Sequence, residues 1–187
     1  MNRRKALAAG AALALAAAAG LSPAAPARAQ SLPELEAMAD QTMQRLVATQ
    51  PVTQEMFDRA AGLLIFPEIV KGGLLIGGST GKGVLRVNGE TTGVYRSASV
   101  SYGLQAGIQR FGYVMVFMTE GALSYLDDTD GWEVGVGPSV VVADDGMLAG
   151  RLSTTTYQDG VYVFFVDQKG YFAGAGIEGT KITRIGE

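Results

Sequence analysis

The stretch KGGLLIGGSTGKGVLRV, residues 71–87, decides how the rest of the chain can fold. Its Val, Ile and Leu residues favour a β-strand, and the pair Asn88-Gly89 directly after it is a hairpin turn signal. Side chains alternate between the two faces of an extended segment. If residues 72–84 are extended, the larger residues Leu74, Ile76, Thr80, Lys82 and Val84 share one face, and the other carries Gly73, Leu75, Gly77, Ser79, Gly81 and Gly83. We therefore predict a strand with one nearly bare face.

A bare face on a strand has two physical interpretations. Glycine inside a strand marks a bulge, a sharp bend or the close approach of another backbone, so tight packing of a curved sheet is the favoured reading. The alternative is that the bare face, or the turn beside it, admits a ligand. In that case Lys71, Lys82 and Arg86 lie near enough in the sequence to meet an anion.

The same stretch is not a nucleotide-binding P-loop. That motif requires G-x-x-x-x-G-K-[ST] followed by a helix, because backbone amides and a helix N-terminus hold the phosphates. Around Gly81-Lys82, the first glycine is replaced by Ile76, the hydroxyl residue by Gly83, and the helix by the strand-like VLRV.

Outward from this stretch, the sequence predicts an α+β fold. Apolar residues at helical spacing predict a helix over residues 32–48, with Ser31 as the N-cap and Pro33 in the first turn. A second helix is expected to begin at a Thr53 cap and to stop at Gly62. Beyond it, short apolar runs alternate with turn signals. These signals are Asn88-Gly89, Asp130-Gly131, Asp145-Gly146, Asp159-Gly160 and Lys169-Gly170.

One further helix interrupts this pattern at TEGALSYL, where Thr119 is the expected cap. The predicted architecture is a single domain in which N-terminal helices pack on a mainly antiparallel, Gly-rich, curved β-sheet. No linker and no second domain is indicated.

The first 29 residues have the features of an export signal. Arg3, Arg4 and Lys5 precede an Ala/Leu run, and Ala27-Arg28-Ala29 resembles a cleavage site before Gln30. The paired arginines favour a twin-arginine signal, and an ordinary secretory signal is the alternative. Segment 1–29 is thus the expected signal and segment 30–187 the domain, located in the periplasm or secreted.

Charge and composition limit what the exported domain can do. Without the signal, 11 basic residues stand against 18 acidic ones, a net charge of −7. This balance argues against nucleic acid as a partner, because nucleic-acid sites need a basic stripe. The chain has no Cys and no His, so the commonest catalytic base and the thiolate metal ligands are missing.

The remaining candidates for chemistry fit structural roles better. Asp127-Asp128-Thr129-Asp130-Gly131 fails the calcium-loop pattern, because Leu126 stands where that pattern needs an acidic or amide residue. Glu120 follows the Thr119 cap, where an acid favours the helix dipole. We expect no catalytic residues, no metal, no cofactor and no enzymatic activity.

Several blocks in order resemble one known family, the SYLF domain, also called the actin-regulator domain in fungal proteins. The resemblance covers about residues 60–182, and its blocks are AAGLLIFPEIVKGG (60–73), YGLQAGIQRFGYVMVFMTE (102–120), WEVGVGPSVVVADDG (132–146) and GYFAGAGIEGTKI (170–182). The resemblance implies lipid or membrane binding of the phosphoinositide or anionic-lipid type. In eukaryotic members a basic amphipathic N-terminal helix is implicated in membrane contact, whereas here that segment carries Glu34, Glu36 and Asp40 against Arg45 alone.

The cations of the β-rich body are therefore the candidates for a lipid headgroup: Lys71, Lys82, Arg86, Arg96 and Arg110. The partner expected is a lipid or a membrane surface. Two other readings stay open: an envelope structural or protein-interaction module that binds no lipid, and a small outer-membrane β-barrel. Against the barrel stand the two N-terminal helices, fully apolar runs such as VMVF, and the polar end KITRIGE.

Overall fold

The computed structural model describes residues 30–128, 132–133, 140–142 and 160–186. The helices are α1 (Leu32–Thr49), α2 (Val52–Arg59) and α3 (Glu120–Asp128). The strands are β1 (Gly62–Val87), β2 (Glu90–Phe117), β3 (Trp132–Glu133), β4 (Val140–Val142) and β5 (Val161–Gly186). Residues 31–187 form one compact unit, so the predicted α+β class, with N-terminal helices and a mainly antiparallel sheet, is confirmed. The predicted signal segment and cleavage site lie outside the described residues.

Three long strands dominate the sheet. β1 has 26 residues, β2 has 28 and β5 has 26, and β2 lies between the other two in the strand order β1-β2-β5-β3. Both ladders of β2 are antiparallel, whereas the short β4 pairs with β5 in parallel. The short apolar runs of the sequence predicted shorter strands, and the strand lengths were therefore wrong, although β1 and β2 are joined by a hairpin as expected.

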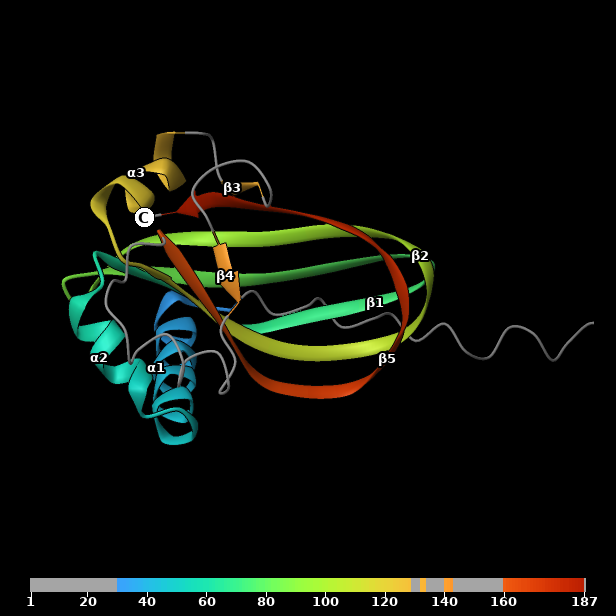
Figure 1. Cartoon of the computed structure of the whole chain (residues 1–187), viewed down its shortest axis with the longest axis horizontal. Coiled ribbons are helices and arrows are strands. Elements are labelled where there is room, and N and C mark those ends of the chain that lie inside the picture. Colours follow the sequence, from blue (N-terminus) through green and yellow to red (C-terminus); the bar gives the residue numbers. More distant parts are fainter. Residues whose placement is uncertain (1–29, 129–131, 134–139, 143–159, 187) are drawn as a thin grey trace, which may run out of the picture. The chain divides into compact units, whose positions relative to one another are not determined.

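The three long strands bend together and return, so the sheet forms two layers. Figure 1 shows β1, β2 and β5 running away from the helices, curving at the far end and coming back. Layer A contains residues 62–73, 107–117 and 161–173, and layer B contains residues 76–87, 90–102 and 177–186. Each strand thus contributes to both layers.

The bend in β1 is a bulge centred on Leu75. The register with β2 shifts between Leu74 and Ile76, and Leu75 adopts a positive φ of 67°. The shift means that Leu74 and Ile76 are both exposed along with Leu75, and regular alternation resumes only afterwards. The two predicted faces of segment 72–84 are therefore correct from Ile76 onward and wrong where they cross the bulge.

The β1–β2 turn is the predicted one. Asn88 and Gly89 have φ values of 53° and 84°, the left-handed pair that a two-residue type I′ turn needs. A bulge follows at once, because Arg86 pairs with Thr91 but Leu85 pairs with Gly93. Thr92 is the extra residue, and its carbonyl accepts a hydrogen bond of 2.7 Å from Arg184.

The Lys169-Gly170 turn does not form. Both residues lie inside β5, opposite Arg110 and Gln109 of β2, so the ladder continues through the turn signal. The irregularity occurs instead at Asp167, which has a φ of 53°. The predicted turns at Asp130-Gly131 and Asp145-Gly146, and Asp159 of the third, lie outside the described residues.

Two predicted helix caps form and two predicted termini of α2 do not, since α2 ends at Arg59 and its expected stop, Gly62, is the first residue of β1. Glu34 accepts hydrogen bonds from the Ser31 backbone N–H (2.9 Å) and hydroxyl (3.0 Å), the pairing of a capping box. Thr119 accepts from the Ala122 N–H at 3.2 Å, so the predicted cap of α3 is confirmed. Thr53 is not a cap: α2 begins at Val52, and the buried Thr53 hydroxyl donates to the Gln50 carbonyl at 2.7 Å.

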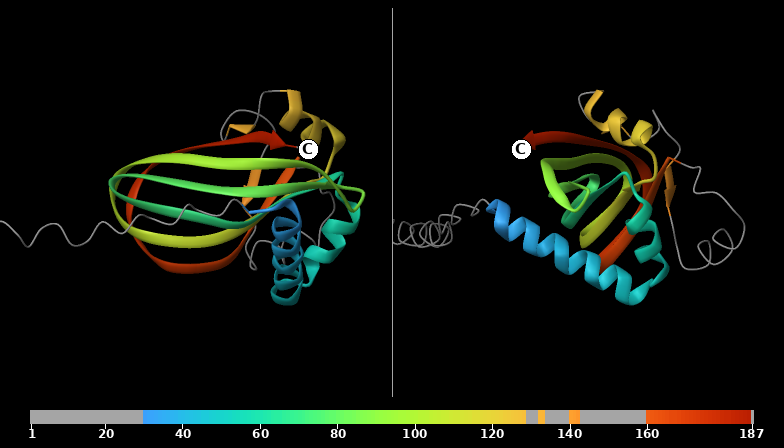
Figure 2. Two further views of the ribbon diagram at one scale, coloured as in Figure 1. Left: turned by 180° about the vertical axis from the view of Figure 1, so that it is seen from behind. Right: turned by 90° about the vertical axis from the view of Figure 1, so that its left-hand side faces the viewer.

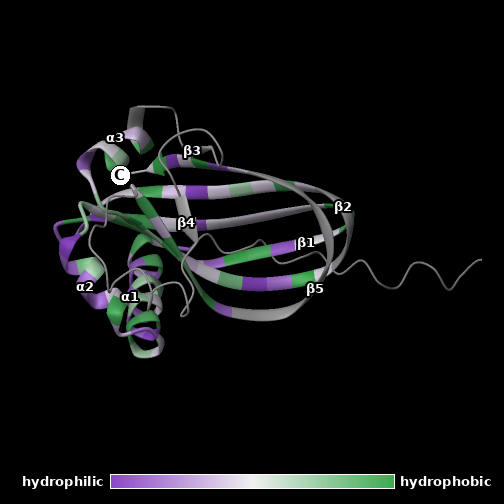
Figure 3. Cartoon of the chain, in the orientation of Figure 1, coloured by the Kyte–Doolittle hydropathy of each residue, from purple (hydrophilic) through white to green (hydrophobic). Residues whose placement is uncertain are grey.

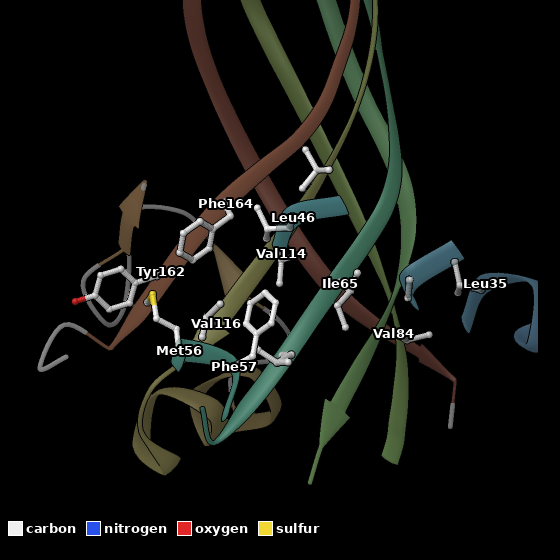
Figure 4. Close-up of a cluster of buried hydrophobic side chains, with 13 residues drawn as sticks. Leu35, Leu46, Met56, Phe57, Ile65, Val84, Val114, Val116, Tyr162 and Phe164 are labelled. Carbon is white, nitrogen blue, oxygen red and sulfur yellow. The ribbon is translucent and has the colours of Figure 1, made fainter. Parts of the chain in front are cut away.

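Two apolar clusters hold the domain together. One lies between layers A and B and includes Phe66, Tyr95 and Phe117, with Ala122 and Leu126 of α3 against it. The other lies where α1 and α2 cover the sheet, and Figure 4 shows its side chains meeting from both helices and all three long strands. Its members are Leu35, Ala39, Leu46, Met56, Phe57, Leu63, Ile65, Val84, Val114, Val116, Tyr162, Phe164 and Val166. Both clusters lie at the helix-bearing end of the strands, and Figure 2 shows α1 running across this end.

Candidate functional site

The bare face of β1 is occupied by the protein's own backbone. A Cβ atom added to Gly81 would lie 2.3 Å from the Glu68 carbonyl oxygen, and one added to Gly83 would lie 2.4 Å from that of Ile65. These carbonyls belong to layer A, while both glycines belong to layer B. The favoured packing interpretation is therefore correct at these positions, where no room is left for a ligand.

Two of the candidate cations are brought side by side. Lys82 of β1 and Arg96 of β2 are direct partners in the antiparallel ladder, on the outer face of layer B. Side chains that oppose each other in this way have Cβ atoms about 5 Å apart, and like charges at that distance destabilise the pair. Arg96 is exposed and Lys82 partly so, and among the residues that the structure describes, neither forms an ion pair. An anion shared between them would remove the repulsion.

The other layer holds two more of the candidates. Arg110 is exposed on the outer face of layer A, opposite Val70 in the ladder. Lys71 follows Val70 and therefore points to the other side, where it is half-buried opposite Gln109. These cations consequently do not join Lys82 and Arg96 in one patch.

Arg86 is committed to a different role. Its guanidinium forms an ion pair with Asp40 of α1, and the Arg86 side chain is only 16% exposed. The pair lines an open pocket of about 450 Å³ between α1, α2 and β1, together with apolar side chains such as Met43, Val47 and Phe57. The structure thus places Arg86 beneath α1, apart from the Lys82–Arg96 pair.

Charge is segregated along the first two long strands. Residues 69–87 and 91–117 contain Lys71, Lys82, Arg86, Arg96 and Arg110 but no Asp or Glu. The chain as a whole is acidic, with 18 Asp and Glu against 15 Lys and Arg. The ribbon formed by β1 and β2 is therefore locally basic in an acidic protein.

A polar seam lies inside the sheet, between the layers. Tyr113 donates a hydrogen bond to Ser97 at 2.8 Å, and the hydroxyls of Ser79 and Ser99 are 2.7 Å apart. Ser97, Ser99 and Ser101 are all buried. Buried hydroxyl groups need hydrogen-bond partners, and here they provide them for one another. The seam therefore fits a structural role inside the folded sheet.

The described part of the chain has no cluster of three or more metal-ligating side chains, and none of its helices has the length and apolar character needed to cross a membrane. The hydrogen bond from the Ser31 backbone N–H, and after it the one from the Ser31 hydroxyl, lower the pKa of the Glu34 carboxyl.

Sequence reasoning missed the exposed apolar residues at the bend. Leu74, Leu75 and Ile76 are consecutive and all face solvent, which strict alternation did not predict. The available signal was the unbroken LLI run directly after Gly72-Gly73, because a strand with one solvated face would place a polar residue among the three.

Comparison with known proteins gives one family match, to the C-terminal part of the chain. No curated protein matches the sequence. A family model described as "Ysc84: Las17-binding protein actin regulator" matches residues 98–186, which include most of β2, all of α3 and all of β5. The matched residues contain three of the four blocks on which the resemblance rests, 102–120, 132–146 and 170–182. Residues 98–186 of this chain therefore match the Ysc84 (SYLF) family model.

Proposed function

We propose that this protein is a non-catalytic membrane-binding domain that recognises anionic lipid headgroups outside the cytoplasm, in the periplasm or after secretion. The observation that carries the proposal is the match of residues 98–186 to the Ysc84 (SYLF) family model. The resemblance described above associates that family with phosphoinositide or other anionic-lipid binding. Export follows from the signal-like segment 1–29.

The charge distribution supports an anionic partner. Lys82 and Arg96 repel each other across the β1–β2 ladder, and the two strands carry no acid between residues 69 and 87 or between 91 and 117. A phosphate group has several acceptor oxygens and can bind an ammonium and a guanidinium at once. Helix α1 is a poorer candidate for this contact, because it carries Glu34, Glu36 and Asp40.

Vesicle co-sedimentation tests the proposal. The chain without residues 1–29 suits this assay, because residues 31–187 form a compact unit and the signal itself would bind lipid. We expect binding to phosphatidylcholine vesicles that contain phosphatidylglycerol or a phosphoinositide, weaker binding to phosphatidylcholine alone, and loss of binding as salt is raised.

A matched pair of variants locates the site. Lys82→Gln/Arg96→Gln should weaken binding to anionic vesicles about thirtyfold, because each cation near the surface contributes roughly 1 kcal/mol. Arg45→Gln/Arg59→Gln removes the same charge from α1 and α2 and should leave binding almost unchanged. Equal loss in both variants would remove Lys82 and Arg96 from the site. A folded chain that binds no vesicle would overturn the proposal and favour an envelope protein-interaction module.

A further inference from the structure

Exposed apolar side chains gather at the bend of the sheet, the end farthest from the helices. Leu74, Leu75 and Ile76 are 74%, 56% and 63% exposed, and Val100 and Ile108 are each 68% exposed. Val100 lies opposite Gly78 and Ile108 opposite Gly72, so both flank the LLI run across the ladder. Figure 3 shows hydrophobic colouring reaching this end of the strands. We call these five residues the apolar tip.

The backbone of the apolar tip adds a second observation. Leu75 has a φ of 67°, in the left-handed region that costs a residue with a side chain about 1–2 kcal/mol and costs glycine almost nothing. Glycine at position 75 would relieve this strain and would also remove an apolar side chain from water. The fold therefore gains nothing from leucine here, which points to a role outside the folded chain itself.

Cations stand behind the apolar tip on both outer faces. Arg110 lies two residues from Ile108 on layer A, and Arg96 lies four residues from Val100 on layer B, with Lys82 opposite it. At about 3.3 Å per residue these separations are about 7 Å and 13 Å. Interfacial proteins place apolar groups about 5–10 Å below the headgroup boundary. Arg110 therefore lies at phosphate depth when Ile108 is inserted, whereas the backbone of Arg96 lies farther out and its long side chain extends toward the headgroups.

We propose that the apolar tip inserts end-on into the outer part of an anionic lipid bilayer while Arg96, Lys82 and Arg110 bind headgroups around it. This inference rests on the proposed function and names the part of the chain that enters the membrane. A bilayer suits the tip better than a protein partner does. The cations occupy opposite faces of the folded sheet, and a planar surface penetrated by the bend contacts both faces at once.

The first test compares two isoleucines in the vesicle assay. Ile76→Thr removes apolar surface at the tip, and Ile185→Thr removes it from an exposed residue at the other end of β5. Burying one such side chain in the apolar part of the membrane favours the bound protein over the free protein about tenfold. We expect Ile76→Thr to weaken binding by that factor and Ile185→Thr to leave it unchanged. Leu75→Gly should weaken binding equally while keeping or raising the thermal stability of the domain, which separates binding from misfolding.

The second test reports insertion directly. The chain has no cysteine, so Leu75→Cys and Ile185→Cys each give one labelling site for an environment-sensitive fluorophore. We expect a blue shift for the label at position 75, and quenching by nitroxide-labelled lipids whose spin label lies at shallow acyl depth. The label at position 185 should show neither effect.

The outcomes separate this inference from the proposed function. Suppose that wild type binds vesicles. Equal quenching of the labels at positions 75 and 185 would then show that the tip does not insert, and so would unchanged binding by Leu75→Gly and Ile76→Thr. Either result overturns the inference and leaves the proposed lipid binding intact. If wild type binds no vesicle, both fail. If the tip variants instead dissociate a dimer seen by sedimentation velocity, with vesicle binding unchanged, the tip is a contact between copies and the inference is wrong.

Discussion

The Tyr113 hydroxyl lies 2.8 Å from the Ser97 hydroxyl oxygen and donates a hydrogen bond to it across the two layers of the sheet. Both residues belong to β2, sixteen positions apart, and both are buried. The strand has therefore folded back far enough for its two halves to be joined by a side-chain contact. Such a bond between buried neutral groups contributes about 1 kcal/mol, and removing one partner costs more because the other loses its acceptor or donor.

A double-mutant cycle should detect this contact. Tyr113→Phe and Ser97→Ala should each lower the free energy of unfolding by about 1–2 kcal/mol, and the double variant should cost less than their sum. Urea unfolding followed by circular dichroism provides the measurement. Strict additivity would show that the two hydroxyls do not interact in solution.

Two glycines at the layer contact should tolerate no side chain. Gly81→Ala and Gly83→Ala place a methyl group 2.3 Å and 2.4 Å from a carbonyl oxygen, so the layers must separate. We expect each to lower the free energy of unfolding by about 3 kcal/mol or to prevent folding.

The control for these variants is Gly72→Ala, also in β1. Its new methyl group would meet the Gly107 carbonyl oxygen at an ordinary 3.8 Å. Stability should stay constant or rise by about 0.5 kcal/mol, because alanine restricts the unfolded chain. A cost at Gly72 equal to that at Gly81 would contradict the layer geometry.

The start of α1 should respond to pH through Glu34. Hydrogen bonds from Ser31 favour the charged carboxylate and lower the pKa of Glu34 from 4.5. A lowered folded-state pKa contributes stability above pH 4.5, and this contribution is lost as the pH falls through the folded-state value. Glu34→Ala should therefore lower the Tm at pH 7 and have no effect at pH 2–3. A Tm difference that is the same at both pH values would exclude this capping interaction.

Arg86 and Lys82 should behave differently although both were candidates for the lipid site. Arg86 is largely buried against Asp40, so Arg86→Gln should lower the free energy of unfolding by about 1 kcal/mol and leave vesicle binding nearly unchanged. Lys82→Gln should leave the free energy of unfolding unchanged and should weaken binding to anionic vesicles. Binding losses of equal size would place the Asp40 pocket in the lipid site.

Features that depend on neighbouring residues could be predicted from the sequence, whereas those that depend on how the long strands pair could not. The Ser31 and Thr119 caps and the Asn88-Gly89 turn depend on neighbouring residues, which a sequence shows directly. The turn signal Lys169-Gly170 was overridden because β2 supplies a continuous partner for β5. A two-residue turn extended without interruption would place Lys82 opposite Tyr95, on the face away from Arg96.

The extra residue Thr92 shifts that register by one and brings the two cations together. A bulge of this kind has no local sequence signature in the stretch GETTGV, so the candidates could be proposed from the sequence but not assembled into a pair. The close contact of Gly81 with Glu68 likewise depends on a fold-back that only the complete sheet reveals.

The double-layered course of the strands also determines the order in which the molecule can form. Strand β5 supplies the third strand of both layers, so neither layer can be completed until residues 161–186 have been synthesised. Until then β2 presents an unpaired edge along its whole length, and its partner contacts are separated by up to about ninety residues of sequence. Folding dominated by such distant pairings is slow, and the open edge is prone to pair with other chains in the meantime. A chaperone that shields β2 during synthesis would therefore protect this domain at its most vulnerable stage.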